Sequence, residues 1–255
     1  LVRTFIGDTD HSSQTATTNS AVVNFQIDGI YTIKVSGIDS FGNVGEPAVL
    51  ENVIIDTTAP SVPVITSGPV DPTNAKEYTV IWDASTDALS GIQGYNVWLN
   101  GELKSTVPQT ETEYRFSYSD LSGDGEVKVE VSAIDNATET GNESDKAVYT
   151  FVVDTIAPAA PEGLSLLPVP ENGENLIGAI NPAFTWNQAS EEGSGVVGYI
   201  LTISDGAGYT SDIPMIGQPE IGQPIRFATS DVLTAGIYTA TVASVDAAGN
   251  VTTEE

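Results

Sequence analysis

Short segments that alternate apolar with polar or small residues recur along the chain. Three of them align without gaps: YTIKVSGID at residues 31–39, VKVEVSAID at 127–135 and YTATVASVD at 238–246. Alternation with a period of two is typical of a strand with one buried face. Each segment runs into a loop rich in Asp, Asn and Gly. The pattern therefore predicts three equivalent half-buried strands, each followed by a turn.

A second motif, in which a Trp leads into a polar loop and then into Gly-Tyr, occurs twice. WDASTDALSGIQGY spans residues 82–95, and WNQASEEGSGVVGY spans residues 186–199. Apolar ends around a loop of Ser, Gly and acidic residues predict strand, loop and strand. The motifs recur at a spacing of roughly 100 residues, which is typical of tandem β-sandwiches. We find no convincing helix, and the Val, Ile, Thr, Tyr, Gly and Pro content favours strands and turns, so we predict an all-β fold.

Two segments with the same order of residues are expected to join the repeats. VIIDTTAPSVPVI at 53–65 and FVVDTIAPAAPEG at 151–163 each end an apolar strand at an aspartate and continue into Ala-Pro. Pro60 and Pro158 fix φ and remove a strand donor, so these linkers should be short and stiff. We predict a partial domain at 1–56 with later strands only, a complete domain at 57–154, and a third at 155–255 whose last strand is truncated.

The motifs, taken in their order along the chain, resemble a known group of repeats. A Trp is followed by SGIQGY or SGVVGY, then by Leu233, Gly236 and Tyr238, and then by a strand that ends in Asp and leads to Gly-Asn. This order is similar to that of fibronectin type III and bacterial immunoglobulin-like repeats in large bacterial surface proteins of the adhesin or surface-layer type. It covers nearly all of residues 21–255. The resemblance implies immunoglobulin-like sandwiches arranged end to end.

Charge and composition narrow the range of partners. The 255 residues contain 8 Lys and Arg against 35 Asp and Glu, a formal charge of −27. Phosphate backbones and anionic membrane surfaces bind proteins with the opposite excess, so neither is expected as a partner. The sequence has no run of about 18 or more apolar residues, so membrane insertion is not expected either. The absence of Cys excludes a disulfide framework and thiolate metal sites. Self-repulsion of this size makes divalent cations the first partner to consider.

The linker aspartates and the acidic loops are expected to meet. In the topology that the resemblance implies, Asp56 and Asp154 each lie beside the loops of the domain that follows. Carboxylates and loop carbonyls are the ligands of Ca²⁺, in sets of about 6–8 oxygens. We therefore predict two groups of calcium ligands: Asp56, Asp83, Asp87, Asp135 and Asn136 in the first, and Asp154, Glu191, Glu192, Asp246 and Asn250 in the second.

A competing interpretation needs no metal. Asp, Asn and Gly are common in turns because their side chains or conformational freedom satisfy local backbone groups. No loop carries the spaced acids and glycine of an EF-hand, so a site contained in one loop is excluded. Both interpretations remain open from the sequence alone.

Catalytic candidates are few. His11 is the only histidine and lies in a Thr- and Ser-rich stretch, where a solvated loop is the simpler interpretation. Without Cys or a second His, a nucleophilic triad has no residues to build on. The acids recur in each repeat, as structural sites do, so we expect no catalytic residues, no organic cofactor and no enzymatic activity.

Aromatic residues and one insert define an alternative. Trp82 and Trp186 alternate inward and are expected in the core. Trp98 faces outward and is expected either to be covered by a neighbouring strand or domain, which is the preferred interpretation, or to stack on a sugar. The third repeat carries an extra segment, SDIPMIGQPEIGQPIRF, at 211–227. It is expected to be either a cover for an edge strand or a divergent binding loop.

The preferred hypothesis is a non-enzymatic spacer or stalk of a secreted or cell-surface protein, stiffened by calcium between domains. Its partners would be neighbouring repeats of a longer chain. The alternative is an adhesive or carbohydrate-binding accessory module of an extracellular protein, with a cell-surface glycan or protein as its partner.

Overall fold

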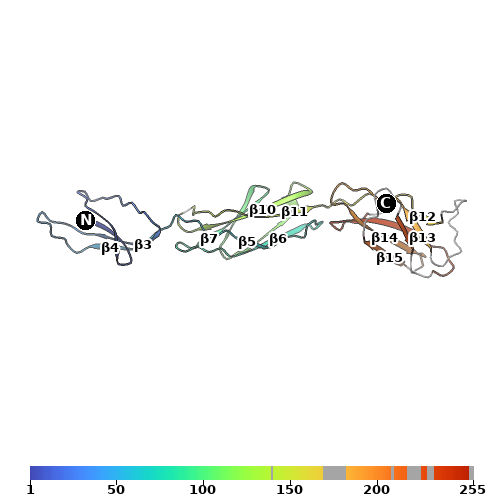
Figure 1. The fold of residues 1–255 in the computed structure, drawn as a ribbon, viewed down its shortest axis with the longest axis horizontal. Helices are drawn as coiled ribbons and strands as arrows, with labels where there is room; N and C mark the ends of the chain where they lie inside the picture. The colour runs from blue at the N-terminus through green and yellow to red at the C-terminus, as the bar shows by residue number, and fades with distance from the viewer. Residues whose placement is uncertain (139, 169–181, 208–209, 217–224, 229–232, 253–255) are drawn as a thin grey trace. The chain divides into compact units, whose positions relative to one another are not determined.

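Antiparallel strands make up nearly all of the regular structure in a computed structural model of the chain (Figure 1). The structure describes residues 1–138, 140–168, 182–207, 210–216, 225–228 and 233–252. Within these residues, the helical content is one 3₁₀ turn, η1 (Tyr118–Asp120). The all-β fold predicted from the alternating pattern is confirmed. None of the described helices has the length and apolarity needed to cross a membrane.

The chain divides into two compact units. The first comprises Leu1–Gly68, Thr79–Arg115 and Lys128–Tyr149, and the second comprises Pro69–Tyr78, Phe116–Val127 and Thr150–Glu255. Each unit thus combines segments that lie far apart in the sequence. The predicted domain boundaries at residues 56 and 154 are not tested by this division and stay predictions.

The N-terminal sheet belongs to the first unit and has the strand order β2-β1-β3-β4. Its strands are β1 (Val2–Ile6), β2 (Thr9–Gln14), β3 (Gly29–Val35) and β4 (Ala48–Ile55). Tyr31 of β3 is buried, and its hydroxyl donates to the carbonyl of Ile27 at 2.7 Å. This bond ties the connection before β3 to the buried face of the sheet. Asp56 follows directly after β4, so the pairing of β4 with β3 sets the position of its backbone.

Two sheets follow along the chain. One has the order β5-β6-β9 and contains β5 (Val64–Ser67), β6 (Glu77–Asp83) and β9 (Glu113–Ser117). The other has the order β11-β10-β7-β8 and contains β7 (Ile92–Leu99), β8 (Glu102–Pro108), β10 (Gly125–Asp135) and β11 (Ala147–Val153).

Large side chains of these two sheets pack on one another. In the first unit, the rings of Trp82 and Tyr95 lie 5.4 Å apart between centroids. In the second unit, Tyr78 contacts both Phe116 and Phe151. Buried aromatic contacts between facing sheets are the core of a β-sandwich.

The C-terminal part repeats this arrangement inside the second unit. One sheet has the order β12-β13-β16, with β12 (Ser165–Leu167), β13 (Ala183–Trp186) and β16 (Ile225–Ala228). The other has the order β15-β14-β17, with β14 (Val196–Ser204), β15 (Thr210–Ile216) and β17 (Thr239–Asp246). The insert predicted at 211–227 contributes residues to β15 and β16, and its residues 217–224 lie outside the described part.

The two repeated tryptophans organise equivalent cores. Trp82 and Trp186 are each 1% exposed, as the alternation predicted. The tyrosine that ends each motif packs edge-on against its tryptophan, and its hydroxyl accepts a backbone N–H of the preceding loop, from Ser85 to Tyr95 and from Ala189 to Tyr199. These contacts fix the start of the acidic loop that follows each tryptophan strand.

We expect Trp186→Ala to lower the free energy of unfolding of the second unit by about 3–5 kcal/mol, because truncating a buried Trp removes apolar contacts and leaves a cavity. The amide NMR signals of that unit, followed through a urea titration, measure this loss. The matched control is Trp98→Ala, which removes a half-buried indole and should cost less. Equal losses for the two variants would contradict the core assignment.

Candidate functional site

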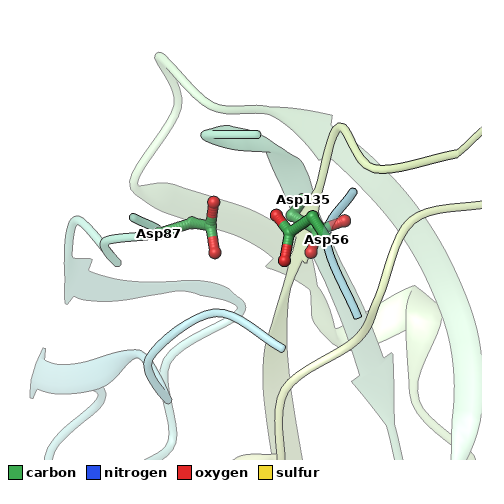
Figure 2. A group of neighbouring side chains, drawn as sticks. All are labelled: Asp56, Asp87 and Asp135. Atoms are coloured by element: carbon green, nitrogen blue, oxygen red, sulfur yellow. The ribbon is translucent and has the colours of Figure 1, made fainter. Parts of the chain in front are cut away.

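Three carboxylates from separate segments converge in the first unit. Asp56 follows β4, Asp87 lies in the loop after β6, and Asp135 is the last residue of β10. One oxygen of each lies within 4.8 Å of the others. Figure 2 shows the Asp87 carboxylate facing those of Asp56 and Asp135. Asp135 is buried, and the other two are half-buried.

Backbone N–H groups hold each carboxylate in place. One Asp87 oxygen accepts hydrogen bonds from Leu89 at 3.0 Å and from Gly91 at 2.8 Å. Asp56 accepts from Thr58 and from Ser90, both at 3.1 Å. The second of these bonds ties the residue after β4 to the Asp87 loop.

The Asp87 carboxyl is stabilised as an anion. Burial raises its pKa, but the N–H groups of Gly91, Leu89 and their neighbours together lower it by more, so the pKa lies below its ordinary value. The loop around Asp87 therefore favours the charged form that a metal ligand needs.

Asn142 connects the Asp135 carboxylate to the backbone of Asp56 and was missed from the sequence. Its backbone N–H donates to Asp135 Oδ1 at 2.7 Å, and its side-chain amide donates to Asp135 Oδ2 at 2.8 Å. The same amide reaches the carbonyl of Asp56 at 3.3 Å. The available signal was the Gly-Asn pair that ends each of the three aligned loops, whereas the prediction chose Asn136 at the start of its loop.

The second unit contains the same arrangement. Asp154, Glu191 and Asp246 each bring one oxygen within 4.8 Å of the others, and Asp154 and Asp246 are buried. Asn250 donates to Asp246 Oδ2 at 2.7 Å and to the carbonyl of Asp154 at 2.9 Å, as Asn142 does in the first unit. Glu191 accepts short bonds from the N–H groups of Gly193 and Gly195.

The electrostatics of the two triads favour a bound cation. Two like charges about 4 Å apart repel by about 4 kcal/mol at an effective dielectric constant of 20. The ion pairs found among the described residues involve other carboxylates, at Asp10, Glu102, Glu113 and Glu130. The N–H donors leave carboxylate lone pairs available, and hard oxygen ligands of this kind suit Ca²⁺.

Four predicted ligands lie outside the triads. Asp83 is exposed at the end of β6, and Glu192 is exposed beside Glu191. Asn136 donates its amide to the carbonyls of Ser90 and Gly91, and Asn250 uses its amide as described above. The structure therefore brings together six of the ten predicted residues, while the metal-binding role of all ten stays a prediction.

The N-terminal repeat offers an internal comparison. Asp39 accepts from the N–H groups of Phe41 and Asn43 and from the Asn43 amide at 2.7 Å, which is the bonding pattern of Asp135 and Asp246. These bonds, the Asn43 amide first, lower the pKa of Asp39. Asp39 is exposed and belongs to neither triad. The Asp-to-Asn loop thus closes by local bonding, and only the convergence of three segments requires a further explanation.

A second pair of aspartates, also missed from the sequence, fastens the linkers. Asp28 accepts from the backbone and hydroxyl of Thr57 and from the Thr58 hydroxyl at 2.6 Å. Asp124 accepts from the backbone and hydroxyl of Thr155. Both aspartates immediately precede a glycine that begins a strand, in the segments DGIY before β3 and DGEV before β10, and one further strand separates each of these strands from its linker. This shared Asp-Gly pair was the signal that could have identified them.

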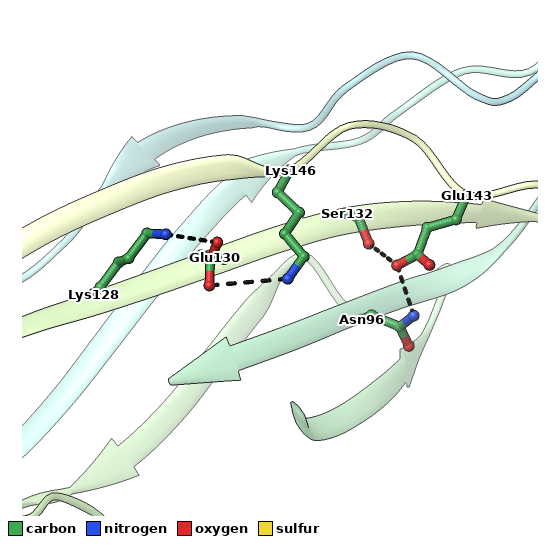
Figure 3. Close-up of polar contacts among 6 residues, drawn as sticks. All are labelled: Asn96, Lys128, Glu130, Ser132, Glu143 and Lys146. Carbon is green, nitrogen blue, oxygen red and sulfur yellow. Dashed lines mark hydrogen bonds and ion pairs between the residues drawn. The ribbon is translucent and has the colours of Figure 1, made fainter. Parts of the chain in front are cut away.

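The exposed aromatic candidate is covered by its neighbours. Lys146 Nζ lies 3.6 Å from the centroid of the Trp98 ring. Figure 3 shows Lys146 and Lys128 paired with Glu130 from either side. Close by, Glu143 accepts hydrogen bonds from Ser132 and Asn96. An ammonium over an indole occupies the surface on which a sugar would stack. His11, the only histidine, is exposed and faces Tyr31 edge-on with 6.1 Å between ring centroids.

Comparisons with known proteins find similarity to part of an enzyme and to fibronectin domains. No family model matches the chain. Exoglucanase B of Cellulomonas fimi is 32% identical over 242 residues, which cover 87% of this chain and 19% of the exoglucanase. The FN1–FN3 domains of chicken CNTN1 share 17% identity at a TM-score of 0.44, over 87% of this chain and 71% of that one. The fibronectin(III)-like modules of Clostridium thermocellum CbhA share 19% identity at a TM-score of 0.35, over 60% and 77%.

Asn142→Ala should lower the free energy of unfolding by about 1–3 kcal/mol, because it removes a donor to a buried carboxylate and to a backbone carbonyl. Urea unfolding of the first unit measures the effect. The matched control is Asn43→Ala, which removes the equivalent amide from the exposed Asp39 loop and should cost less than about 1 kcal/mol. Equal costs would show that the triad adds nothing to the local loop.

Acid should weaken the first unit partly through Asp87. Its folded pKa is lower than its unfolded pKa, so its contribution to stability is complete above the unfolded value and is lost as pH falls through the folded value. We therefore expect the stability difference between the unaltered chain and Asp87→Asn to shrink between about pH 5 and pH 2. Urea unfolding at several pH values measures it, and a difference that stays constant over this range would contradict the assignment.

Proposed function

We propose that the chain is a non-catalytic spacer segment of an extracellular protein in which calcium bound at the two triads stiffens the connections between successive repeats. The observation that carries this proposal is the recurrence of one constellation in both units. In each, a linker aspartate, an acid of the tryptophan loop and the aspartate that ends a strand share one volume, and an asparagine joins the first to the third.

A cation at either triad would act on the linker directly. Asp56 and Asp154 are linker residues, whereas the other two acids of each triad lie in the loop after the tryptophan strand and at the end of β10 or β17. An ion that binds all three would neutralise their repulsion and fix the linker against those loops. Extracellular modules bind calcium with Kd values of about 10⁻⁴–10⁻³ M, which free calcium outside cells can saturate.

The linkers themselves support a stiff connection. Pro60 and Pro158 restrict φ and are buried. Asp28 and Asp124 accept hydrogen bonds from threonines that precede these prolines in the linkers. Directly after the prolines, the backbone N–H groups of Ser61 and Ala159 donate to the carbonyls of Thr86 and Ser190, so each Ala-Pro is held on both sides. A bound ion would further reduce the conformational freedom of a linker that the proline and these hydrogen bonds already restrict.

The non-catalytic role is supported by repetition. Acids occur twice at equivalent positions with equivalent backbone donors, and a reaction centre seldom needs two copies in one chain. The similarity to Exoglucanase B covers 19% of that enzyme, which fits a segment that accompanies a catalytic domain rather than one that forms it. The proposed calcium affinity would require an extracellular location, since free calcium inside cells would leave the triads empty.

We expect calcium to raise the melting temperature of the 255-residue chain relative to chelator, because an ion that binds only the folded state stabilises it by RT ln(1 + [L]/Kd). At a hundredfold excess over Kd the gain would be about 2.7 kcal/mol. Asp56→Ala and Asp154→Ala should each abolish the gain at one site, as measured by calorimetry and by calcium titration.

The control variant is Asp39→Ala, which alters the same type of loop where no triad exists and should leave the calcium response intact. Small-angle scattering tests the mechanical part of the proposal, since chelation should broaden the distribution of distances within the molecule. Identical melting and scattering in calcium and in chelator would remove the basis for calcium stiffening.

A further inference from the structure

A groove opens beside the second triad, inside the second unit. Its volume is about 590 Å³, and its lining includes Asp124, Asp154, Ile156, Pro158, Glu191 and Glu192. This volume lies within the range of pockets that accept small ligands or side chains. The groove runs along the linker and has an apolar wall and an acidic rim.

The groove is lined by residues that differ between the two units. Aligning TDALSG with SEEGSG places Glu192 where the first unit has Ala88, and Gly193 where it has Leu89. A side chain at Gly193 would meet the carboxylates of Asp154 and Glu191, since an added Cβ would lie 2.4 Å from an oxygen of each. The second unit therefore lacks a leucine that the first unit has beside its triad.

The linkers of the two units also differ in a residue beside the groove. Thr58 of the first unit turns its hydroxyl onto Asp28, whereas the equivalent residue in the second unit is Ile156, which cannot form this bond. The Ile156 side chain is 67% exposed on the wall of the groove. An exposed isoleucine next to a buried proline is an apolar surface that gains free energy when covered.

The rim is uniformly negative. Asp124, Asp154, Glu191 and Glu192 are its charged residues, and none of the lining residues is Lys, Arg or His. Burial raises the pKa of Asp124, but the Thr155 N–H, the hydroxyls of Tyr118 and Thr155 and the charge of Lys76 lower it by more, so Asp124 is an anion. Glu192 is exposed and can turn toward a ligand.

We propose that this groove docks an arginine side chain with an adjacent aliphatic residue from an extended segment of a partner protein. The guanidinium is planar and pairs with carboxylates through two parallel hydrogen bonds, which suits a rim of several acids. The aliphatic neighbour would cover Ile156 and Pro158. Calcium at the second triad would occupy Asp154 and Glu191 and would compete with the guanidinium, whereas the proposed ion does not use Glu192 or the apolar wall. The inference therefore concerns the calcium-free groove and does not depend on the calcium proposal.

Suitable substitutions for a test are the residues that stand at the equivalent positions of the first unit. Glu192→Ala and Ile156→Thr each convert the groove residue to its counterpart, Ala88 or Thr58. The probe is the capped tripeptide Val-Arg-Val, titrated in chelator into the 255-residue chain and followed by amide NMR shifts. The control probe replaces arginine with citrulline, which has the same shape without the charge.

We expect saturable shifts around residues 154–158 and 190–193 with a millimolar Kd. A charge-assisted hydrogen bond lost from an exposed rim should weaken binding about three- to tenfold in Glu192→Ala, and the loss of apolar cover should have a similar effect in Ile156→Thr. The citrulline probe should bind at least tenfold more weakly. Since the titration contains chelator, a failure of the calcium proposal leaves these expectations unchanged.

Three results would overturn the proposal. The first is the absence of saturable shifts in the groove while the chain remains folded. The second is equal binding of the arginine and citrulline probes, because the charge argument would then be wrong. The third is unchanged affinity in both variants, which would place the peptide elsewhere.

Discussion

Repulsion among carboxylates that share one small volume is the constraint on which the two triads depend. Three acids within 4.8 Å raise the energy of the folded state unless donors or a cation compensate. Here backbone N–H groups compensate in part, and they can do so only because the loops after β6 and β13 close around their own acids. The loop conformation therefore determines how far the repulsion among the carboxylates is compensated.

The sheets position one acid of each triad, because that acid lies where a strand ends. Asp135 and Asp246 are the last residues of β10 and β17, so the registers of these strands with β7 and β14 set where the acids lie. Those registers depend in turn on which residues face the core. The hydrophobic pattern around Trp82 and Trp186 thus positions polar residues that it never touches.

Sequence reasoning found the elements that rest on periodicity and missed those that rest on side-chain direction. The alternation at 127–135 and 238–246 predicted strands that end at an acid, and the structure has them. Spacing along a loop could not show that Asn142 rather than Asn136 turns toward Asp135, because loop backbones lack a fixed repeat. Asp28 and Asp124 were missed for a related reason, since their partners lie across a whole strand pair from them.

The repeats also separate local causes from tertiary ones. Asp39 shows that an aspartate and an asparagine close this type of loop without further acids. The loop motif alone therefore gives no evidence for a metal, and it explains why the sequence left both interpretations open. Local bonding also holds the third carboxylate, because Asp56 and Asp154 accept hydrogen bonds from the backbone N–H groups of Thr58 and Ile156, two residues further on. These bonds hold each acid singly, and the convergence of three acids within 4.8 Å is the part of the arrangement that the proposed cation would use.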